Sequence, residues 1–152
     1  MHKVIISDTS CFIILSKVNE LNLLEKLYGQ VVTTFEVAEE FGEQLPEWVV
    51  IEYVKDKSKQ NILELQIDKG ESSAISLALE FPQSTIILDD FKARKIARKL
   101  GISHTGTLGV IISAKHKGII PSIKPILEKI KNTNFRISAE IELKALKEAN
   151  EY

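Results

Sequence analysis

The sequence predicts an α/β domain built around a mainly parallel β-sheet. Short, uninterrupted runs of β-branched residues, such as Val4-Ile5-Ile6 and Ile86-Ile87, are typical of strands that are buried on both faces. Segments whose apolar residues recur at helical spacing separate these runs along the chain. Strands that alternate with helices favour a parallel sheet, because each parallel connection needs a crossover and a helix supplies it.

The first half of the chain is expected to alternate strands with helices. Residues 3–7 are typical of a buried strand, and Asp8 can cap a helix whose apolar face runs from Phe12 to Val18. A short helix at residues 21–28 is stopped by Gly29. The next elements are a strand at 31–34, a helix at 35–41 and a strand at 49–54.

In the second half, residues 55–61 are polar and are expected to form a surface loop, whereas residues 62–67 fit a strand or a helix. A helix opens at Gly70-Glu71 and stops before Pro82. The remaining elements are a strand at 85–88, a basic helix at 91–100, an extended segment at 102–105, and helices at 107–117, near 122–132 and at 138–149. We expect one domain over residues 1–152, in which the C-terminal helix has the weakest pattern.

Composition narrows the class of protein. The net charge of -1 gives no overall attraction to nucleic acid, so any RNA contact must come from a local basic patch. Cys11 is the only cysteine, which excludes an intrachain disulfide and a zinc site of several thiolates; we expect it to be a small buried hydrophobe. No run approaches the ~18 apolar residues of a membrane helix, and the N-terminal apolar stretch is too short for a signal peptide. A soluble, cytoplasmic protein without membrane contact is expected.

Acidic residues follow two of the predicted strands directly. Asp8 comes after residues 3–7, and Asp89-Asp90 come after residues 85–88. In an open parallel sheet, ligands bind outside the carboxyl ends of the strands, so these acids should meet in one crevice. Crowded carboxylates repel each other, and a hard divalent cation such as Mg²⁺ or Mn²⁺ relieves the repulsion. The pattern therefore predicts a metal site at Asp8, Asp89 and Asp90, although Lys92 and Arg94 could compensate the acidic pair instead.

Two glutamates are further candidates. Glu40 lies between Val37 and Phe41 at helical spacing, which turns its side of the helix toward the core. Glu71 stands in the first turn of its helix, where the helix dipole alone already favours an acid. The other glutamates of the segment around Glu40 are expected on a solvated face: Glu36, Glu39 and Glu43.

The helix expected at 91–100 starts at the acidic corner and carries two basic stripes. A solvated helix face is the ordinary interpretation of such charges. Their position beside the acidic crevice would nevertheless suit a phosphate backbone. The weak candidates for nucleic-acid binding are Lys92, Arg94, Lys95 and Arg98.

Five motifs occur in a characteristic order. They are Asp8-Thr9-Ser10, Val37-x-x-Glu40, Gly70-Glu71-x-x-Ala74-Ile75, Leu88-Asp89-Asp90-x-x-Ala93-Arg94-x-x-Ala97 and Thr105-Gly106-Thr107-Leu108-Gly109. In this order they resemble the PIN-domain family, and more narrowly its VapC-like toxin branch. The likeness spans about residues 3–138. No single motif is specific, but five in the right order make chance a poor explanation.

The resemblance implies a three-layer α/β/α sandwich whose acids bind Mg²⁺ or Mn²⁺ and hydrolyse phosphodiester bonds in RNA. It also implies a small antitoxin protein as a partner and, often, a homodimer. Better characterised toxins of the family usually carry Asp where this chain has Glu71. By motif, the catalytic acids are Asp8, Glu40, Glu71 and Asp89, with Thr9 and Thr107 as polar helpers, Asp90 as a rival of Asp89 and Glu39 as a lesser rival of Glu40.

Other functions and one stability expectation stay open. The glutamate at position 71, where the toxins usually carry aspartate, and the near-neutral net charge favour a PIN-like module that binds RNA or protein without cutting. A phosphoacceptor resembling a response-regulator receiver fits less well, because its paired acids would follow the first strand, whereas here the pair comes late. If the four acids converge, Asp89→Asn should relieve repulsion and leave the metal-free protein equally or more stable.

Overall fold

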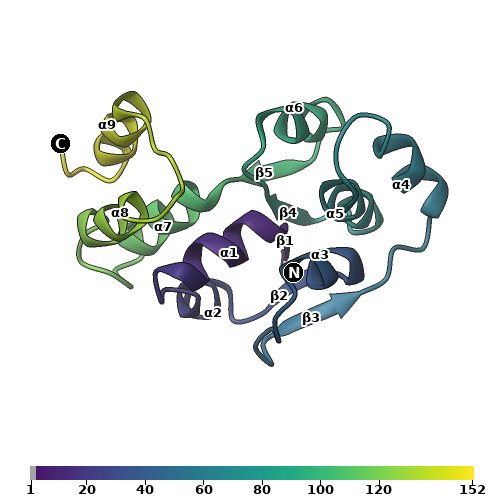
Figure 1. The fold of residues 1–152 in the computed structure, drawn as a ribbon, viewed down its shortest axis with the longest axis horizontal. Coiled ribbons are helices and arrows are strands. Elements are labelled where there is room, and N and C mark those ends of the chain that lie inside the picture. The colour runs from purple at the N-terminus through teal and green to yellow at the C-terminus, as the bar shows by residue number, and fades with distance from the viewer. Residues whose placement is uncertain (1–2) are drawn as a thin grey trace.

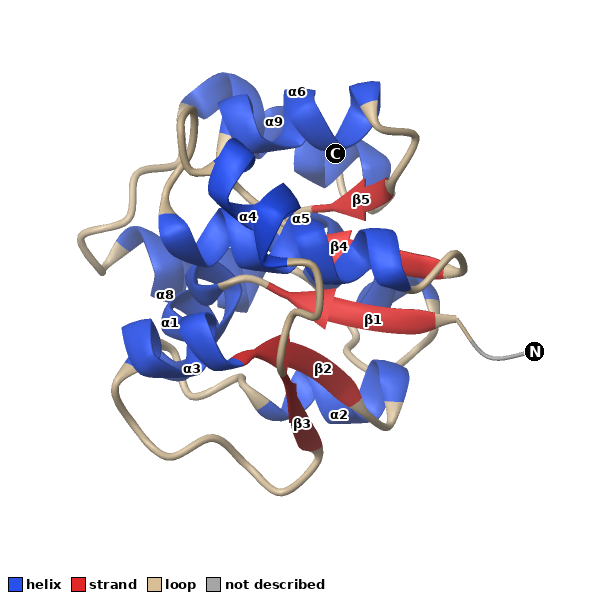
Figure 2. Ribbon diagram, turned by 90° about the vertical axis from the view of Figure 1, so that its right-hand side faces the viewer, coloured by secondary structure: helices blue, strands red, loops and turns tan. Residues whose placement is uncertain are grey.

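The five strands form an all-parallel sheet in the order β3-β2-β1-β4-β5. The computed structural model describes residues 3–152, and the strand order can be followed in Figure 2. The chain builds outward from β1 to β3 and then crosses to the other side of β1, so the order reverses at the centre of the sheet. A crevice opens at the carboxyl edge of such a reversal. The strands are β1 (Val4–Ser7), β2 (Val31–Thr34), β3 (Val49–Glu52), β4 (Ser84–Ile87) and β5 (Ser103–Thr105).

Helices fill the connections between these strands (Figure 1). The longest, α5, has 12 residues, and no helix within residues 3–152 is both long enough and apolar enough to cross a bilayer. The helices of this part of the chain are α1 (Thr9–Lys17), α2 (Asn22–Tyr28), α3 (Phe35–Phe41), α4 (Lys57–Leu63), α5 (Lys69–Glu80), α6 (Phe91–Lys99), α7 (Thr107–His116), α8 (Lys124–Lys131) and α9 (Ala139–Glu148).

Neighbouring residues of the central strands face opposite layers, as the two-residue period of a strand requires. Ile5 and Ile87 belong to an apolar cluster with α1, α2, α7 and α8. Ile6 and Ile86 belong to a second cluster, with α5 and α6. The sheet therefore has a helical layer on each face, and the predicted three-layer α/β/α architecture is confirmed.

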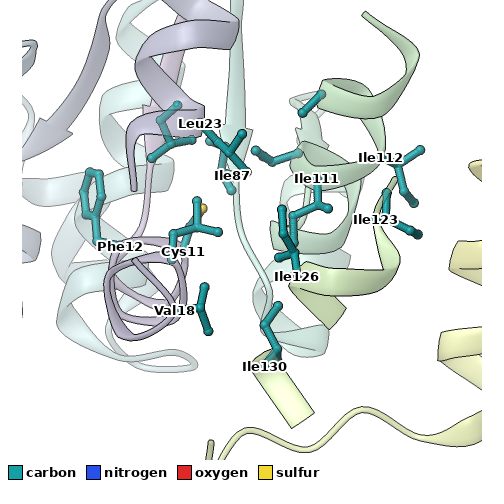
Figure 3. Close-up of a cluster of buried hydrophobic side chains, with 14 of the residues drawn as sticks. Cys11, Phe12, Val18, Leu23, Ile87, Ile111, Ile112, Ile123, Ile126 and Ile130 are labelled. Carbon is teal, nitrogen blue, oxygen red and sulfur yellow. The ribbon is translucent and has the colours of Figure 1, made fainter. Parts of the chain in front are cut away.

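The first of these clusters holds the single cysteine (Figure 3). Cys11 is 1% exposed and lies among side chains of α1, α7 and α8, including Phe12, Ile111 and Ile126. Burial raises the pKa of its thiol far above the ordinary value, so the side chain stays uncharged. The expected role as a small buried hydrophobe is confirmed.

One stretch differs from its prediction. Residues 55–61 were expected to form a loop on account of their polarity, but α4 covers most of them. Asp56 caps this helix by accepting a hydrogen bond from the amide of Lys59 at 3.2 Å. The inward side of α4 is polar: Gln60 is buried and donates to Glu36 at 2.8 Å. The ambiguous residues 62–67 hold the last turn of α4 and the turn before α5.

The C-terminal helix α9 forms at the predicted place and is tied to α7. Ser138 caps it by accepting from the amide of Ile141 at 3.1 Å. Lys115 of α7 donates to the carbonyl of Ala149 at 2.5 Å and pairs with Glu151 at 3.3 Å. These contacts hold the end of the chain against the helical layer that contains α7.

Candidate functional site

Asp8 lies at the carboxyl edge of the sheet, directly after β1. The register pairs Ser7 with Ile87, so Asp8 stands level with the residue that follows β4. Its side chain is buried, with the residue 4% exposed, and the Oδ1 atom has no hydrogen-bond partner within the described residues. Asp8 occupies the N-cap position of α1, but its side chain makes no capping hydrogen bond. The capping role that an aspartate could play here is therefore not what this side chain does.

Thr9, Glu40 and Gly70 surround the buried carboxyl of Asp8. Thr9 Oγ1 donates to Glu40 Oε1 at 2.7 Å, which joins α1 to α3. A Cβ atom at Gly70 would collide with Glu40 Oε1 and lie 3.6 Å from Asp8 Oδ1. Glycine therefore lets the first turn of α5 approach the two acids without displacing the Glu40 carboxyl. Glu39 and Glu40 are both exposed, and Glu40 differs from its rival by the hydrogen bond from Thr9.

The remaining glutamates near α3 do not all lie on a solvated face. Glu36 pairs with Lys57 at 2.9 Å and accepts from Gln60 at 2.8 Å. Burial opposes ionisation, but these two donors outweigh it and lower the pKa of Glu36 below its ordinary value. The expectation of a solvated Glu36 was therefore wrong, because α4 provides it with partners. Glu39 and Glu43 are exposed as expected.

Glu71 takes part in a capping box at the start of α5. Its backbone amide donates to Asp68 Oδ1 at 2.7 Å, and the amide of Asp68 donates to Glu71 Oε1 at 3.2 Å. This arrangement satisfies two amides that a helix N-terminus leaves without partners. Glu71 therefore has a definite structural role in addition to its place beside the acidic cluster.

Two of the carboxyl groups, those of Asp8 and Glu71, have raised pKa values. Burial raises the pKa of Asp8 from its ordinary 3.8 to about 7, and the charges of Glu71, Asp68 and Glu40 add to the shift. Burial also raises the pKa of Glu71 from 4.5 to about 7, with contributions from Asp68, Asp90 and Glu40. Such mutual repulsion requires the acids to lie near each other. Asp8, Glu40, Glu71 and Asp90 thus form one acidic cluster, together with Asp68.

Asp89 is bound to the next helix. Its Oδ1 accepts from the amide of Thr107 at 2.7 Å and its Oδ2 accepts from Thr107 Oγ1 at 2.6 Å. Both oxygens therefore hold the N-terminus of α7 against the end of β4, where an anion is favoured by the helix dipole. A Cβ atom at Gly106 would lie 2.9 Å from Asp89 Oδ1, so this corner is also closely packed.

Asp90 caps α6, a helix whose basic residues differ in exposure. Asp90 Oδ2 accepts from the amide of Ala93 at 2.9 Å. Arg94 is half-buried, and its guanidinium lies close to Gly106 and the Asp89 corner. No ion pair joins Lys92 or Arg94 to either acid within residues 3–152, so the compensation considered above is not seen. The other basic residues of α6 are exposed: Lys92, Lys95, Arg98 and Lys99.

An open cleft of about 560 Å³ is lined by Asp89 together with residues of the C-terminal helix. Its lining includes Ser10 and Ile14 of α1 and Ile141 of α9. The segment between α8 and α9 contributes further residues of both polar and apolar type. The cleft therefore extends the candidate site away from the buried carboxyl of Asp8.

The donor set suits a hard divalent cation, but the present arrangement does not enclose one. Among residues 3–152, no three His, Cys, Asp or Glu side chains are grouped so that they could hold a metal ion. Glu40, Glu71 and Asp89 each accept a hydrogen bond from the protein. Among the candidate acids of the described chain, Asp8 is the one with a buried oxygen that lacks a partner. That oxygen and the all-oxygen chemistry of the cluster fit Mg²⁺ or Mn²⁺.

Sequence reasoning missed some residues of the site. Asp68 belongs to the acidic cluster, and its spacing from Glu71 matches a capping box, so the sequence did contain a signal. Arg136 and Lys144 line the cleft that Asp89 also lines. They follow Asp89 by more than forty residues, and no local pattern links them to it.

Comparison with known families agrees with this geometry. The family model DUF3368, described as a PIN domain, matches residues 4–151, which is nearly the whole chain. Neither the curated proteins nor the solved structures gave a significant match. The buried acid after β1, the acids around it and the all-parallel sheet are consistent with a nuclease-type fold. The chain therefore belongs to the PIN-domain family.

Proposed function

We propose that the protein is a metal-dependent endoribonuclease of the VapC-like toxin type. PIN domains are generally metal-dependent nucleases. The observation that supports activity most directly is Asp8, a buried carboxyl with an unpartnered oxygen and neighbouring acids that repel its charge. A protein without a cation to bind would gain stability from a neutral side chain at this position.

The residues that would hold Mg²⁺ or Mn²⁺ are Asp8, Glu40, Glu71 and Asp89, with Asp90 as a rival of Asp89. A bound divalent ion lowers the pKa of its water and offsets charge on a phosphate. The protein supplies Asp8 as a preformed acceptor and Thr9 as the donor that orients Glu40. Thr107 holds Asp89 in place through both carboxylate oxygens. No side-chain nucleophile is needed for this chemistry.

Cleavage of RNA by purified protein tests the proposal. We expect single-stranded RNA to be cut in the presence of Mg²⁺ or Mn²⁺ and not in EDTA. Asp8→Asn should abolish the cut, whereas Glu43→Gln, an exposed site outside the cluster, should leave it unchanged. If wild type leaves structured and unstructured RNA intact while a related active enzyme cuts alongside, the proposal fails.

A PIN-like module that binds without cutting is the second candidate. It is favoured by the absence, among residues 3–152, of a three-residue metal group and by the capping-box role of Glu71. Calorimetric titration with Mn²⁺ separates the two functions. The nuclease should bind the ion and lose that binding in Asp8→Asn, whereas a binding module need not bind it at all.

We also propose a small antitoxin partner, a homodimer and action in the cytoplasm, on the basis of the resemblance to VapC-like toxins. Co-expression with the product of a short reading frame next to the gene should yield a stable complex of the two proteins. Light scattering of the purified chain should give twice the monomer mass. A chain that stays monomeric and binds no neighbouring gene product would contradict both expectations.

A further inference from the structure

We propose that the cleft beside Asp89 is a binding subsite for single-stranded RNA, in which Arg136 and Lys144 contact phosphates next to the cleaved bond. The inference rests on the proposed ribonuclease function and adds to it a route for the substrate. Nothing in the PIN motifs points to these two residues, which lie in the C-terminal segment. Their relevance comes only from the walls of the cleft.

The cleft connects the acidic corner to the C-terminal helix. Its lining includes Asp89 and Ser10, and it also includes Arg136 from the segment before α9 and Lys144 from α9 itself. Ser10 is the neighbour of Thr9, which holds Glu40. An RNA strand lying in the cleft would therefore reach the carboxyl edge of β1 and β4, where the acids lie.

The cations of the cleft are available for a ligand. Within residues 3–152, no ion pair engages Arg94, Arg136 or Lys144, and these three cations outnumber the two acids of the cleft lining, Asp89 and Glu148. Both Arg136 and Lys144 are exposed. The chain has a net charge of -1, so attraction of a polyanion depends on a local excess of positive charge such as that of the cleft lining.

The apolar part of the lining favours a single strand over a duplex. The lining of the cleft also has an apolar part beside the cations. This apolar wall consists of Ile14 of α1, Phe135 of the segment before α9, and Ile141 of α9. Ile141 is 50% exposed, so its apolar side chain is accessible to a ligand in the cleft. Unpaired bases can lie against such a wall while their phosphates meet the cations, whereas the bases of a duplex are stacked on each other.

The wall is held firmly by the rest of the fold. Ala145 and Ala149 of the C-terminal segment are buried in the cluster that contains α7 and α8. Lys17 lies over the ring of Phe135 at 5.3 Å and donates to Asn134 at 3.1 Å, which fixes the segment before α9 to α1. Binding therefore needs no large ordering of the cleft, which limits its entropic cost.

Fluorescence anisotropy with a labelled single-stranded RNA oligonucleotide in EDTA tests the cleft without cleavage. The double variant Arg136→Ala/Lys144→Ala should bind at least tenfold more weakly than wild type. The slope of log affinity against log salt should fall by ~1.4, since each single-strand phosphate contact contributes ~0.7. A matched duplex should bind wild type more weakly than the single strand. The control Lys26→Ala/Lys124→Ala removes the same charge at exposed positions outside the cleft and should behave like wild type.

The outcomes separate this inference from the proposed function. The inference is overturned if the cleft variant and the control bind RNA equally, or if wild type binds no RNA. Equal binding would make a polypeptide the better candidate ligand of the cleft. Failure of wild type to cut RNA with Mg²⁺ or Mn²⁺ would instead remove the ribonuclease function, while the binding comparison would still decide the role of the cleft. In an active enzyme, the cleft variant should raise KM far more than it changes kcat.

Discussion

Neutralising Asp8 should make the metal-free protein more stable at neutral and alkaline pH. The folded-state pKa of Asp8 is about 7, against an ordinary 3.8, because the carboxyl is buried beside other acids. Between these values the folded protein keeps a proton that the unfolded chain has released. Unfolding therefore releases a proton, so rising pH lowers stability from about pH 4 to about pH 7 and has no further effect through this group.

The size of the effect follows from the pKa difference. A rise from 3.8 to about 7 corresponds to on the order of 4 kcal/mol at ~1.36 kcal/mol per unit. Asp8→Asn is nearly isosteric and has no charge to bury, so it does not lose this stability. Its free energy of unfolding, relative to wild type, should therefore increase by several kcal/mol as the pH rises, with most of the change between about pH 4 and about pH 7.

Urea denaturation of wild type and Asp8→Asn in EDTA at several pH values measures this difference. Glu71 titrates in the same range, but it is present in both proteins and its contribution largely cancels. Glu43→Gln serves as the control and should track wild type throughout. A difference between wild type and Asp8→Asn that stays flat from about pH 4 to about pH 7 would show that the Asp8 carboxylate is well solvated or compensated. The main support for the metal site would then be lost.

Four further changes test individual contacts. Asp89→Asn should destabilise the metal-free protein by roughly 1–3 kcal/mol in urea titration, because asparagine keeps only one of the two oxygens that accept from Thr107; this loss reverses the sign expected from repulsion alone, and equal stability would contradict it. Glu71→Gln keeps an acceptor for the capping box and removes a repelled charge, so it should be at least as stable as wild type at neutral pH, yet lose Mn²⁺ binding in calorimetry; unchanged binding would leave Glu71 a purely structural role. Gly70→Ala should displace Glu40, reducing stability by roughly 1–3 kcal/mol and abolishing RNA cleavage, whereas wild-type-like behaviour would show that the contact is loose. Mn²⁺ should raise the Tm of wild type in a concentration-dependent way and that of Asp8→Asn much less, and equal shifts would place the ion elsewhere.

Much of the fold was predictable because its signals are local. Runs such as Val4-Ile5-Ile6 indicate buried strands, and glycines such as Gly29 mark helix ends through a positive φ of 76°. The α4 segment was missed because its inward side is polar. Gln60 faces Glu36, which lies 24 positions away, and no local pattern reports such a partner.

The sequence by itself determined which residues could form the site, since acids that follow parallel strands must gather at one edge of the sheet. It could not determine how each acid is satisfied. Only the tertiary structure leaves Asp8 Oδ1 buried without a partner, binds both oxygens of Asp89 to Thr107 and gives Glu71 a capping role. The same holds for Arg136 and Lys144, which reach the cleft only because α9 folds back onto α7. Hydrogen-bond partners and burial depend on contacts between distant segments, so they are decided when the helices pack against the sheet.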